Sequence, residues 1–305
     1  MIERFFEVQP GIEHAESDEA VVIRGDCLAV LSSMKEKTVD LIFADPPYNI
    51  GKNFGNNNDH WGSSEEYISW CKCWIDMCMK VLKDNGTMYF MTSTQQMSQL
   101  DVYVSEKYNV LSRIIWAYDS SGVQSKSCYG SMYEPIIMIN KNKDADFTFN
   151  HEDILVEAKT GAKRKLIDYR KTPPQPYSST KVPGNVWTIN RVRYKMEEYE
   201  NHPTQKPEEL LERIIRASSN TGDVVLDPFS GSFTTCAVAK RLGRLSIGIE
   251  LNDEYYEIGI RRTEISTQYN GKNLVKVKVK KTTAKNKRDH ESQGKSSCVS
   301  SLDSY

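Results

Sequence analysis

Short apolar runs alternate with helix-forming segments along most of the chain, and this alternation constrains the fold more than any other feature of the sequence. The runs that have the length and composition of buried strands are residues 21–24, 39–44, 87–91, 111–118, 135–140, 224–226 and 245–249. The segments with helical periodicity are 65–83, 206–219, 232–242 and 253–265. Strands that alternate with helices predict an α/β fold with a doubly wound, mostly parallel sheet.

The alternation is interrupted between residues 147 and 200, where prolines and basic residues replace it. We interpret this segment as an insertion that separates the first half of an α/β domain, 21–146, from the second half, 201–268. Residues 1–20 form an N-terminal extension. Residues 269–305 form a basic tail that is rich in Lys, Thr and Ser, and we expect it to be disordered.

The apolar run 39–44 ends abruptly in Asp45, Pro46, Pro47 and Tyr48. Prolines cannot donate to a sheet ladder, so the strand must stop here. The carboxylate of Asp45 and a proline carbonyl can each accept one N–H of a planar conjugated amine and localise the nitrogen lone pair for attack. Tyr48 offers a ring on which a heterocycle can stack. These four residues are the predicted catalytic set.

Two segments that are rich in Gly, Asn and Ser follow predicted strands, residues 49–62 and 119–130. Loops at the carboxyl ends of parallel strands are where α/β sheets bind ligands. We expect the first loop to close over the amine and the second to assist in recognition.

A second site is predicted late in the chain, in VVLDPFSGSFTT (224–235) and IGIELN (247–252). A strand leads into a glycine-containing turn that opens a helix, and Glu250 ends the next strand, 19 residues after Gly231. That spacing suits a carboxylate that binds the ribose hydroxyls of an adenosine-containing cofactor. The dinucleotide pattern GxGxxG is absent. A cofactor with an electrophilic methyl group, S-adenosylmethionine, fits both predicted sites.

The net charge of −1 indicates no particular partner, but the distribution of charge does. Between Lys159 and Lys195 there are ten Lys and Arg residues and a single acid, Asp168, with aromatic residues interleaved. This composition favours contact with nucleic acid. The seven cysteines include no C-x-x-C pair, and no metal site is expected. No apolar run approaches a membrane span, so we expect a cytoplasmic protein that works at the nucleoid.

DPPY (45–48) followed much later by DPFSGS (227–232) resembles the amino-group DNA methyltransferases, and the order of the motifs is that of their β class. The resemblance covers about residues 21–265. It is strongest to the solitary DNA adenine methyltransferases of the YhdJ type, through the strings YDSSGVQ, YGSMYEP, DYRKTPPQPY, KVPGNVW and NHPTQKP. It implies the Rossmann-like methyltransferase fold with an inserted DNA-recognition region, S-adenosylmethionine as cofactor, and flipping of the target base out of the duplex.

The resemblance also implies roles for individual residues. Asp26 would lie near the adenine of the cofactor, Glu250 at its ribose, and the residues around its methionine part would be His202, Thr204, Lys206, Asp227, Phe229, Gly231 and Ser232. The first three of this last group would hold the cofactor carboxylate. One departure is Phe233, where many family members have a second glycine; it leaves the conformation of this turn open.

For DNA, the resemblance implies methylation of N6 of adenine within a short palindrome, ATGCAT, and a palindrome suits a homodimer. The candidate DNA-binding residues are Lys163, Arg164, Arg170, Lys171, Lys181, Arg191 and Arg193. Arg191 and Arg193 would share a face if their segment were a strand, and are the candidates for reading a guanine edge.

Two alternatives remain open from the sequence. The first keeps the chemistry but methylates N4 of cytosine; enzymes of that kind more often have Ser where this chain has Asp45, which favours adenine. Methylation of cytosine C5 is disfavoured because no cysteine follows a proline. The second alternative is a nucleotide-binding oxidoreductase, against which the missing GxGxxG counts.

Overall fold

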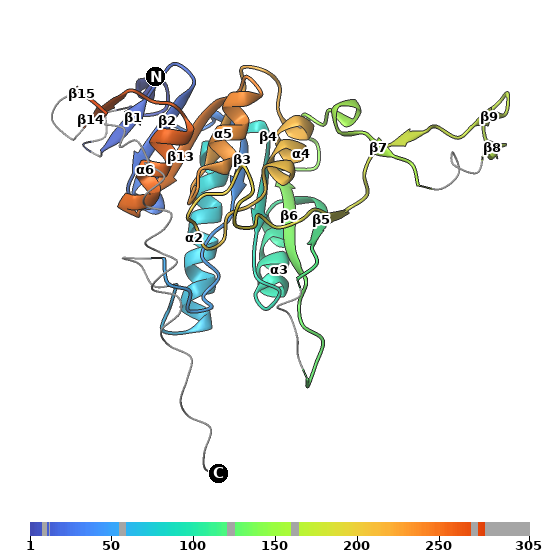
Figure 1. The fold of residues 1–305 in the computed structure, drawn as a ribbon, viewed down its shortest axis with the longest axis horizontal. Coiled ribbons are helices and arrows are strands. Elements are labelled where there is room, and N and C mark those ends of the chain that lie inside the picture. The colour runs from blue at the N-terminus through green and yellow to red at the C-terminus, as the bar shows by residue number, and fades with distance from the viewer. Residues whose placement is uncertain are drawn as a thin grey trace, which may run out of the picture.

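The computed structural model describes residues 1–7, 11, 13–54, 59–120, 126–159, 165–269 and 274–277. The predicted α/β fold is confirmed. Its centre is a run of five parallel strands in the spatial order β4 (Leu82–Met91), β3 (Val39–Ala44), β12 (Val224–Asp227), β13 (Leu245–Glu250) and β2 (Ala20–Arg24) (Figure 1).

Strands at both ends extend this parallel centre within the described part of the chain. Beyond β4 lies β6 (Tyr133–Asn140), which is antiparallel both to β4 and to the next strand, β5 (Asn109–Ala117). The last strand on this side is β11 (Val186–Thr188), which is parallel to β5. Beyond β2 lie β1 (His14–Glu16), β14 (Thr267–Tyr269) and β15 (Leu274–Lys276), all antiparallel.

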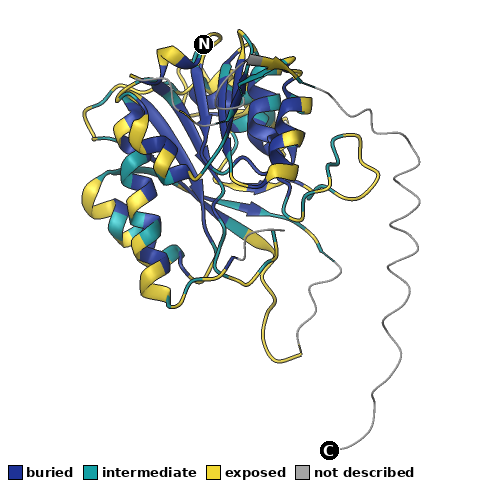
Figure 2. Ribbon diagram, turned by 90° about the vertical axis from the view of Figure 1, so that its left-hand side faces the viewer, coloured by how far each residue is buried: buried dark blue, intermediate teal, exposed yellow. Residues whose placement is uncertain are grey.

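Helices cover both faces of the sheet because successive side chains of a strand point to opposite faces. Ile42 of β3 lies in the core with the helices α1 (Cys27–Ser33), α2 (Ser64–Val81) and α3 (Met97–Lys107). Leu41 and Phe43 of the same strand lie in a second core with α4 (Glu208–Ser218) and α5 (Thr234–Arg241). The helix α6 (Asp253–Arg262) packs beside α5 against β2. Figure 2 shows buried strands between helices whose outer sides are exposed.

The segment 147–200 lies mostly outside the main sheet. It contains the short helices and strands η2 (His151–Ile154), β7 (Val156–Glu157), β8 (Ile167–Asp168), β9 (Gln175–Pro176) and β10 (Thr180–Lys181). β7 pairs with β10 and β8 with β9, and Figure 1 shows these small sheets projecting from the body. β11 then returns the chain to the main sheet.

Several elements differ from the sequence-based expectation. The short helices α1 and α3, and the short strands β1, β11 and β14, were not predicted. β4 begins at Leu82 rather than 87, because α2 passes directly into it. Residues 274–276 of the predicted disordered tail form β15 in the main sheet, and most of the remaining tail lies outside the described residues. Among the residues described, no helix has the length and hydrophobicity that a membrane span requires.

Candidate active site

A cavity of about 570 Å³ opens at the carboxyl ends of β2, β3, β12 and β13. These ends meet because β3 and β12 are neighbours in the sheet although some 180 residues separate them in the chain. The cavity brings together the predicted catalytic set after β3 and the predicted cofactor turn after β12. The two sites inferred from the sequence therefore form one continuous cavity.

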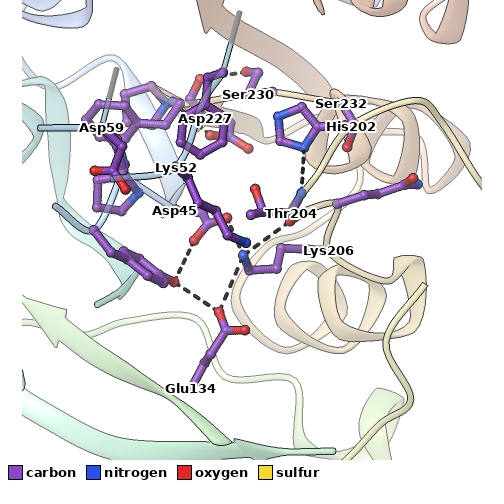
Figure 3. Close-up of a pocket in the computed structure, with 18 of the residues that line it drawn as sticks. Asp45, Lys52, Asp59, Glu134, His202, Thr204, Lys206, Asp227, Ser230 and Ser232 are labelled. Atoms are coloured by element: carbon purple, nitrogen blue, oxygen red, sulfur yellow. Dashed lines mark hydrogen bonds and ion pairs between the residues drawn. The ribbon is translucent and has the colours of Figure 1, made fainter. Parts of the chain in front are cut away.

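Asp45, directly after β3, lies at the centre of a buried polar cluster (Figure 3). The Tyr48 hydroxyl donates to Asp45 Oδ1 at 2.7 Å, and Lys206 Nζ lies 2.5 Å from Asp45 Oδ2. The Pro47 carbonyl accepts a hydrogen bond from the Tyr67 hydroxyl of α2 at 2.9 Å. That bond fixes the proline pair and favours the Pro46 carbonyl as the second acceptor for an amine.

Lys206 lies between two carboxylates. Besides its contact with Asp45, its Nζ lies 3.4 Å from Glu134 Oε2, and the Tyr48 hydroxyl lies 3.1 Å from the same oxygen. The side chains of Lys206, Asp45 and Glu134 are 8%, 15% and 16% exposed. Lys206, which the family resemblance assigned to the cofactor carboxylate, is therefore bound to Asp45, the predicted catalytic aspartate, in this structure.

Sequence reasoning gave no role to Glu134, although the string YGSMYEP contains it. Glu134 stands near the start of β6, opposite Trp116 of β5. Its proximity to Asp45 depends on the pairing of β4 with β6, a long-range contact that no local motif shows. Two lining residues of this end, Trp116 and Tyr118, were likewise not predicted.

Burial and charge oppose each other at the two central groups. Burial raises the pKa of the Asp45 carboxyl, and the Lys206 ammonium acts in the opposite direction. Burial alone would lower the pKa of Lys206, but the carboxylates of Asp45 and Glu134 outweigh it and leave that pKa raised. Lys206 is thus held as an ammonium ion between the two acids.

At the other end of the cavity, Glu250 ends β13 as the sequence predicted. Its Oε2 accepts the backbone N–H of Gly231 at 2.8 Å, and its Oε1 accepts that of Asn252, also at 2.8 Å. Burial raises the pKa of Glu250, and these backbone donors counteract the shift. The carboxylate is held at the turn, where a ribose could reach it.

Gly231, in the turn after β12, and His202, on the segment before α4, approach each other closely. Gly231 has φ +50, and a Cβ there would lie 2.8 Å from Nε2 of His202. The His202 ring packs edge-on against Tyr255, with 4.4 Å between ring centroids. The backbone N–H of Thr204 donates to His202 Nδ1 at 3.3 Å, which leaves the proton on Nε2. Burial lowers the pKa of His202 to about 3, so the ring is neutral.

The other predicted cofactor residues line the same cavity. Asp26 caps α1 by accepting the backbone N–H of Ala29 at 3.0 Å. Phe229 packs against Trp74, with 5.2 Å between ring centroids. Ser232 is buried and its hydroxyl lies 3.1 Å from that of Thr234.

Asp227 is occupied by protein partners. It is buried and accepts hydrogen bonds from the Thr235 hydroxyl at 2.5 Å and from the backbone N–H of Phe229 at 3.0 Å. Burial raises its pKa to about 7. These contacts indicate that Asp227 shapes the turn.

Phe233 resolves the open question about this turn. It adopts the left-handed conformation, with φ +56, that a glycine would adopt at the same position. Its ring is fully buried beside Gly248 of β13 and Gly259 of α6, where a Cβ would lie 2.5 and 2.6 Å from ring atoms. The aromatic side chain is accommodated because both neighbours lack one.

The loop that follows the catalytic set reaches the cofactor end of the cavity. Asn252 Nδ2 donates to the Phe54 carbonyl at 2.8 Å, and the Phe54 ring lies 6.0 Å from that of His202. Asp59 is buried and accepts the backbone N–H groups of Asn49 and Ile50. These contacts join the two described parts of the loop, 49–54 and 59–62; its closure over the amine stays a prediction.

The candidate DNA-binding residues fall into three groups. Arg170, Lys171, Lys181 and Arg193 are exposed, and Arg170 is bound to Asp168 at 2.8 Å. Arg191 instead lines the cavity, with its guanidinium 5.0 Å from the centre of the Tyr118 ring. Arg191 and Arg193 were expected to share a face if their segment were a strand, but residues 189–193 are not a strand. Lys163 and Arg164 lie outside the described residues.

Within the described ranges, no group of three or more His, Cys, Asp or Glu side chains is arranged to hold a metal ion.

The chain is similar in sequence to known DNA methyltransferases. A family model described as DNA methylase (N6_N4_Mtase) matches residues 39–261. The chain is 55% identical over 277 residues to the DNA adenine methyltransferase YhdJ of Escherichia coli (strain K12), covering 91% of this chain and 94% of the relative. It is 34% identical over 262 residues to the Type II methyltransferase M.HpaI of Haemophilus parainfluenzae, covering 85% and 78%.

Two solved structures share the fold. The PvuII DNA methyltransferase (cytosine-N4-specific) aligns with a TM-score of 0.62 at 20% identity, covering 84% of this chain and 89% of that one. The M1.HpyAVI–SAM complex aligns with a TM-score of 0.54 at 23% identity, covering 79% and 98%. The predicted fold class, a sheet of the methyltransferase type, is confirmed.

Proposed function

The chain belongs to the family of N6/N4 DNA methylases, and on that premise we propose that it transfers a methyl group from S-adenosylmethionine to N6 of adenine in double-stranded DNA. The observation that carries this proposal is the meeting of Asp45 and Glu250 in one cavity, each at the carboxyl end of a parallel strand. One carboxylate is placed for an amine and the other for a ribose.

The residues at the cofactor end fit S-adenosylmethionine. Glu250 can accept the ribose hydroxyls, and Asp26 lies on the same wall of the cavity for the adenine. Gly231 can approach the His202 ring closely only because it has no side chain, and this approach holds His202 beside the turn where the cofactor would bind. The neutral His202 presents an Nε2–H donor that suits the cofactor carboxylate. When bound, the cofactor supplies an electrophilic methyl group on a sulfonium.

At the amine end, Asp45 and the Pro46 carbonyl would each accept an N–H of the target amine. Positive charge develops on this nitrogen as the methyl group is transferred, and a carboxylate already in position stabilises that charge. Tyr48 and Trp116 line this end with rings against which a base can stack. The base reaches the cavity only when it is flipped out of the duplex.

Adenine is the proposed target for two reasons. Asp45 heads the motif, and the relative with 55% identity is named a DNA adenine methyltransferase. The recognition sequence suggested by the resemblance is the palindrome ATGCAT, and a homodimer would match its symmetry. We propose that the segment 147–200 recognises the DNA sequence. An enzyme that acts on chromosomal DNA would work in the cytoplasm, at the nucleoid.

The test is transfer of labelled methyl from S-adenosylmethionine to unmethylated DNA, followed by digestion to nucleosides and mass spectrometry. N6-methyldeoxyadenosine is the expected product. N4-methyldeoxycytidine would establish the cytosine alternative, and absence of transfer to any DNA would refute the proposal.

The same DNA, sequenced by a single-molecule method, tests the recognition site. Methylation confined to one six-base palindrome is expected. Methylation scattered over unrelated adenines would contradict assignment of a specific site.

A further inference from the structure

Lys206 occupies the catalytic carboxylate in a way that conflicts with substrate binding. Asp45 Oδ2 is 2.5 Å from the Lys206 ammonium, and Oδ1 accepts the Tyr48 hydroxyl at 2.7 Å. The target amine needs one of these oxygens as an acceptor. It also becomes positively charged during the reaction, and a second cation on the same carboxylate opposes that charge.

The structure provides an alternative partner for Lys206. Glu134 Oε2 lies 3.4 Å from the ammonium and 3.1 Å from the Tyr48 hydroxyl. The two groups that contact Asp45 thus already lie near this second carboxylate. Exchange from one acid to the other requires only a small rotation of the lysine side chain, because the ammonium lies between them.

Glu134 is suited to receive Lys206 because its backbone is fixed in the sheet. It belongs to β6, which pairs with β4 on one side and β5 on the other. Lys206 lies on the segment before α4, where its buried ammonium also donates to the Thr204 carbonyl at 3.3 Å, and the flexible stem of a lysine allows the ammonium to move between the two acids. Two further cations, Lys52 and Arg191, line the same cavity and would repel a displaced ammonium that had no acid to receive it.

We propose that Glu134 is a positioning residue for methyl transfer: it takes over the Lys206 ammonium and the Tyr48 hydroxyl when the target amine enters, and thereby frees Asp45 to accept the amine N–H. This inference rests on the proposed function. Lys206 in turn keeps the buried Asp45 ionised in the empty site, since an unpaired buried carboxylate is costly.

The first test compares Glu134→Gln with the wild-type enzyme. Loss of a charged hydrogen-bond partner is expected to lower kcat about 10- to 100-fold. Affinity for S-adenosylmethionine, measured by calorimetry, should stay within a few-fold. Glu134→Asp, which retains the charge, should recover part of the rate. Glu106→Gln, an exposed change on α3, is the matched control and should be neutral.

The second test is a double-mutant cycle with Lys206→Met. If Glu134 acts by receiving Lys206, Glu134→Gln should have little further effect on kcat once Lys206 is Met. If the two losses simply multiply, Glu134 acts independently of Lys206 and the inference is wrong. If Lys206→Met does not fold, Lys206→Gln replaces it in the cycle. Independently of the cycle, equal values of kcat for Glu134→Gln and Glu134→Asp would overturn the proposal.

A fluorescent adenine analogue, 2-aminopurine, at the target position gives a third readout, the entry of the base. Its amine is at C2 and not at C6, so its entry does not require Asp45 as an acceptor, and the fluorescence increase should be the same in Glu134→Gln and in the wild type. A reduced increase in Glu134→Gln would show that Glu134 acts on entry of the base and not through Asp45. A wild-type enzyme that methylates no DNA would refute the proposed function itself. A wild-type enzyme that is active beside an equally active Glu134→Gln would refute only this inference.

Discussion

At the scale of single residues, the two carboxylates of the cavity differ in the groups that hold them. Asp45 is surrounded by hydrogen-bond donors that can exchange, a hydroxyl and an ammonium. Glu250 is held by backbone N–H groups that cannot move without moving the turn. The first arrangement suits a group whose partners change during the reaction, and the second suits a fixed contact to a ligand.

Asp45→Ala should abolish methylation, since loss of a prearranged partner for developing charge typically costs on the order of a hundredfold or more in rate. Cofactor affinity should stay within a few-fold, because Glu250 and the turn after β12, which are proposed to hold the cofactor, lie at the other end of the cavity. Methyl transfer and calorimetry measure the two quantities, with the exposed Asp144→Ala as control. Near-normal turnover in Asp45→Ala would remove this residue from the mechanism.

Glu250→Ala should weaken binding of S-adenosylmethionine by roughly 1.5–3 kcal/mol, the value of a hydrogen bond to a charged group. Glu250→Gln keeps one acceptor oxygen, so its affinity for S-adenosylmethionine should lie between that of the wild type and that of Glu250→Ala. Calorimetry measures the effect, with the exposed Glu254→Ala on α6 as the matched control. Unchanged affinity in Glu250→Ala would show that the ribose lies elsewhere.

At the scale of elements, the turn between β12 and α5 is stabilised from within. The Phe233 ring fills space that Gly248 on β13 and Gly259 on α6 leave open, and it thereby packs the turn against both elements. Asp227, Thr235 and Phe229 close the other side of the turn by hydrogen bonds. The cofactor turn is therefore preformed by the core beneath it.

Phe233→Ala should destabilise the protein by about 3–5 kcal/mol, the usual cost of truncating a buried phenylalanine. Urea unfolding measures the free energy of unfolding. Gly259→Ala should also be destabilising, because its Cβ would lie 2.6 Å from the Phe233 ring and its three nearest atoms all belong to that ring. In the Phe233→Ala background the same change should cost much less, and equal costs in both backgrounds would contradict direct packing of the ring on Gly259.

Burial of Asp227 should make stability depend on pH. Its pKa is raised from 3.8 to about 7 in the folded protein, so between these values the folded state holds a proton that the unfolded state has lost. The contribution of Asp227 to the free energy of unfolding is fully present below about pH 4 and falls as the pH rises toward 7. In Asp227→Asn, the stability measured by thermal or urea unfolding should decline less between about pH 4 and 7. If the stability of this variant depends on pH as that of the wild type does, other groups cause the pH dependence.

At the scale of the whole molecule, the sequence predicted what local patterns determine. The strand 39–44 and its abrupt end at Asp45 were correct because apolar periodicity and prolines act locally. The seven-residue helix α1 was missed because it is too short to show periodicity, and α3 because its residues are largely polar. Glu134 and the position of Lys206 depend on contacts between distant segments, which the sequence of either segment does not contain.

The exposed basic residues predict how DNA binding responds to salt. Lys181→Ala should weaken binding to all DNA sequences and reduce the salt dependence, as expected for a phosphate contact. Arg193→Ala should relax specificity at one position if it reads a guanine edge. Arg191→Ala should lower turnover instead, because Arg191 lines the catalytic cavity. Binding isotherms at several salt concentrations, and sequencing of the methylated DNA, separate these outcomes.

The pairing of β3 with β12 has a consequence for how the protein is made. Because β12 lies some 180 residues later in the chain, the first half of the sheet leaves the ribosome with the β3 edge that β12 will cover still open. An unpaired apolar strand edge is a site of aggregation, and pairing across so long a separation is slow to form. A nascent chain that stalls within residues 147–200 thus carries the complete catalytic motif but no active site. Its survival depends on protection of that edge until the last third of the protein has been synthesised.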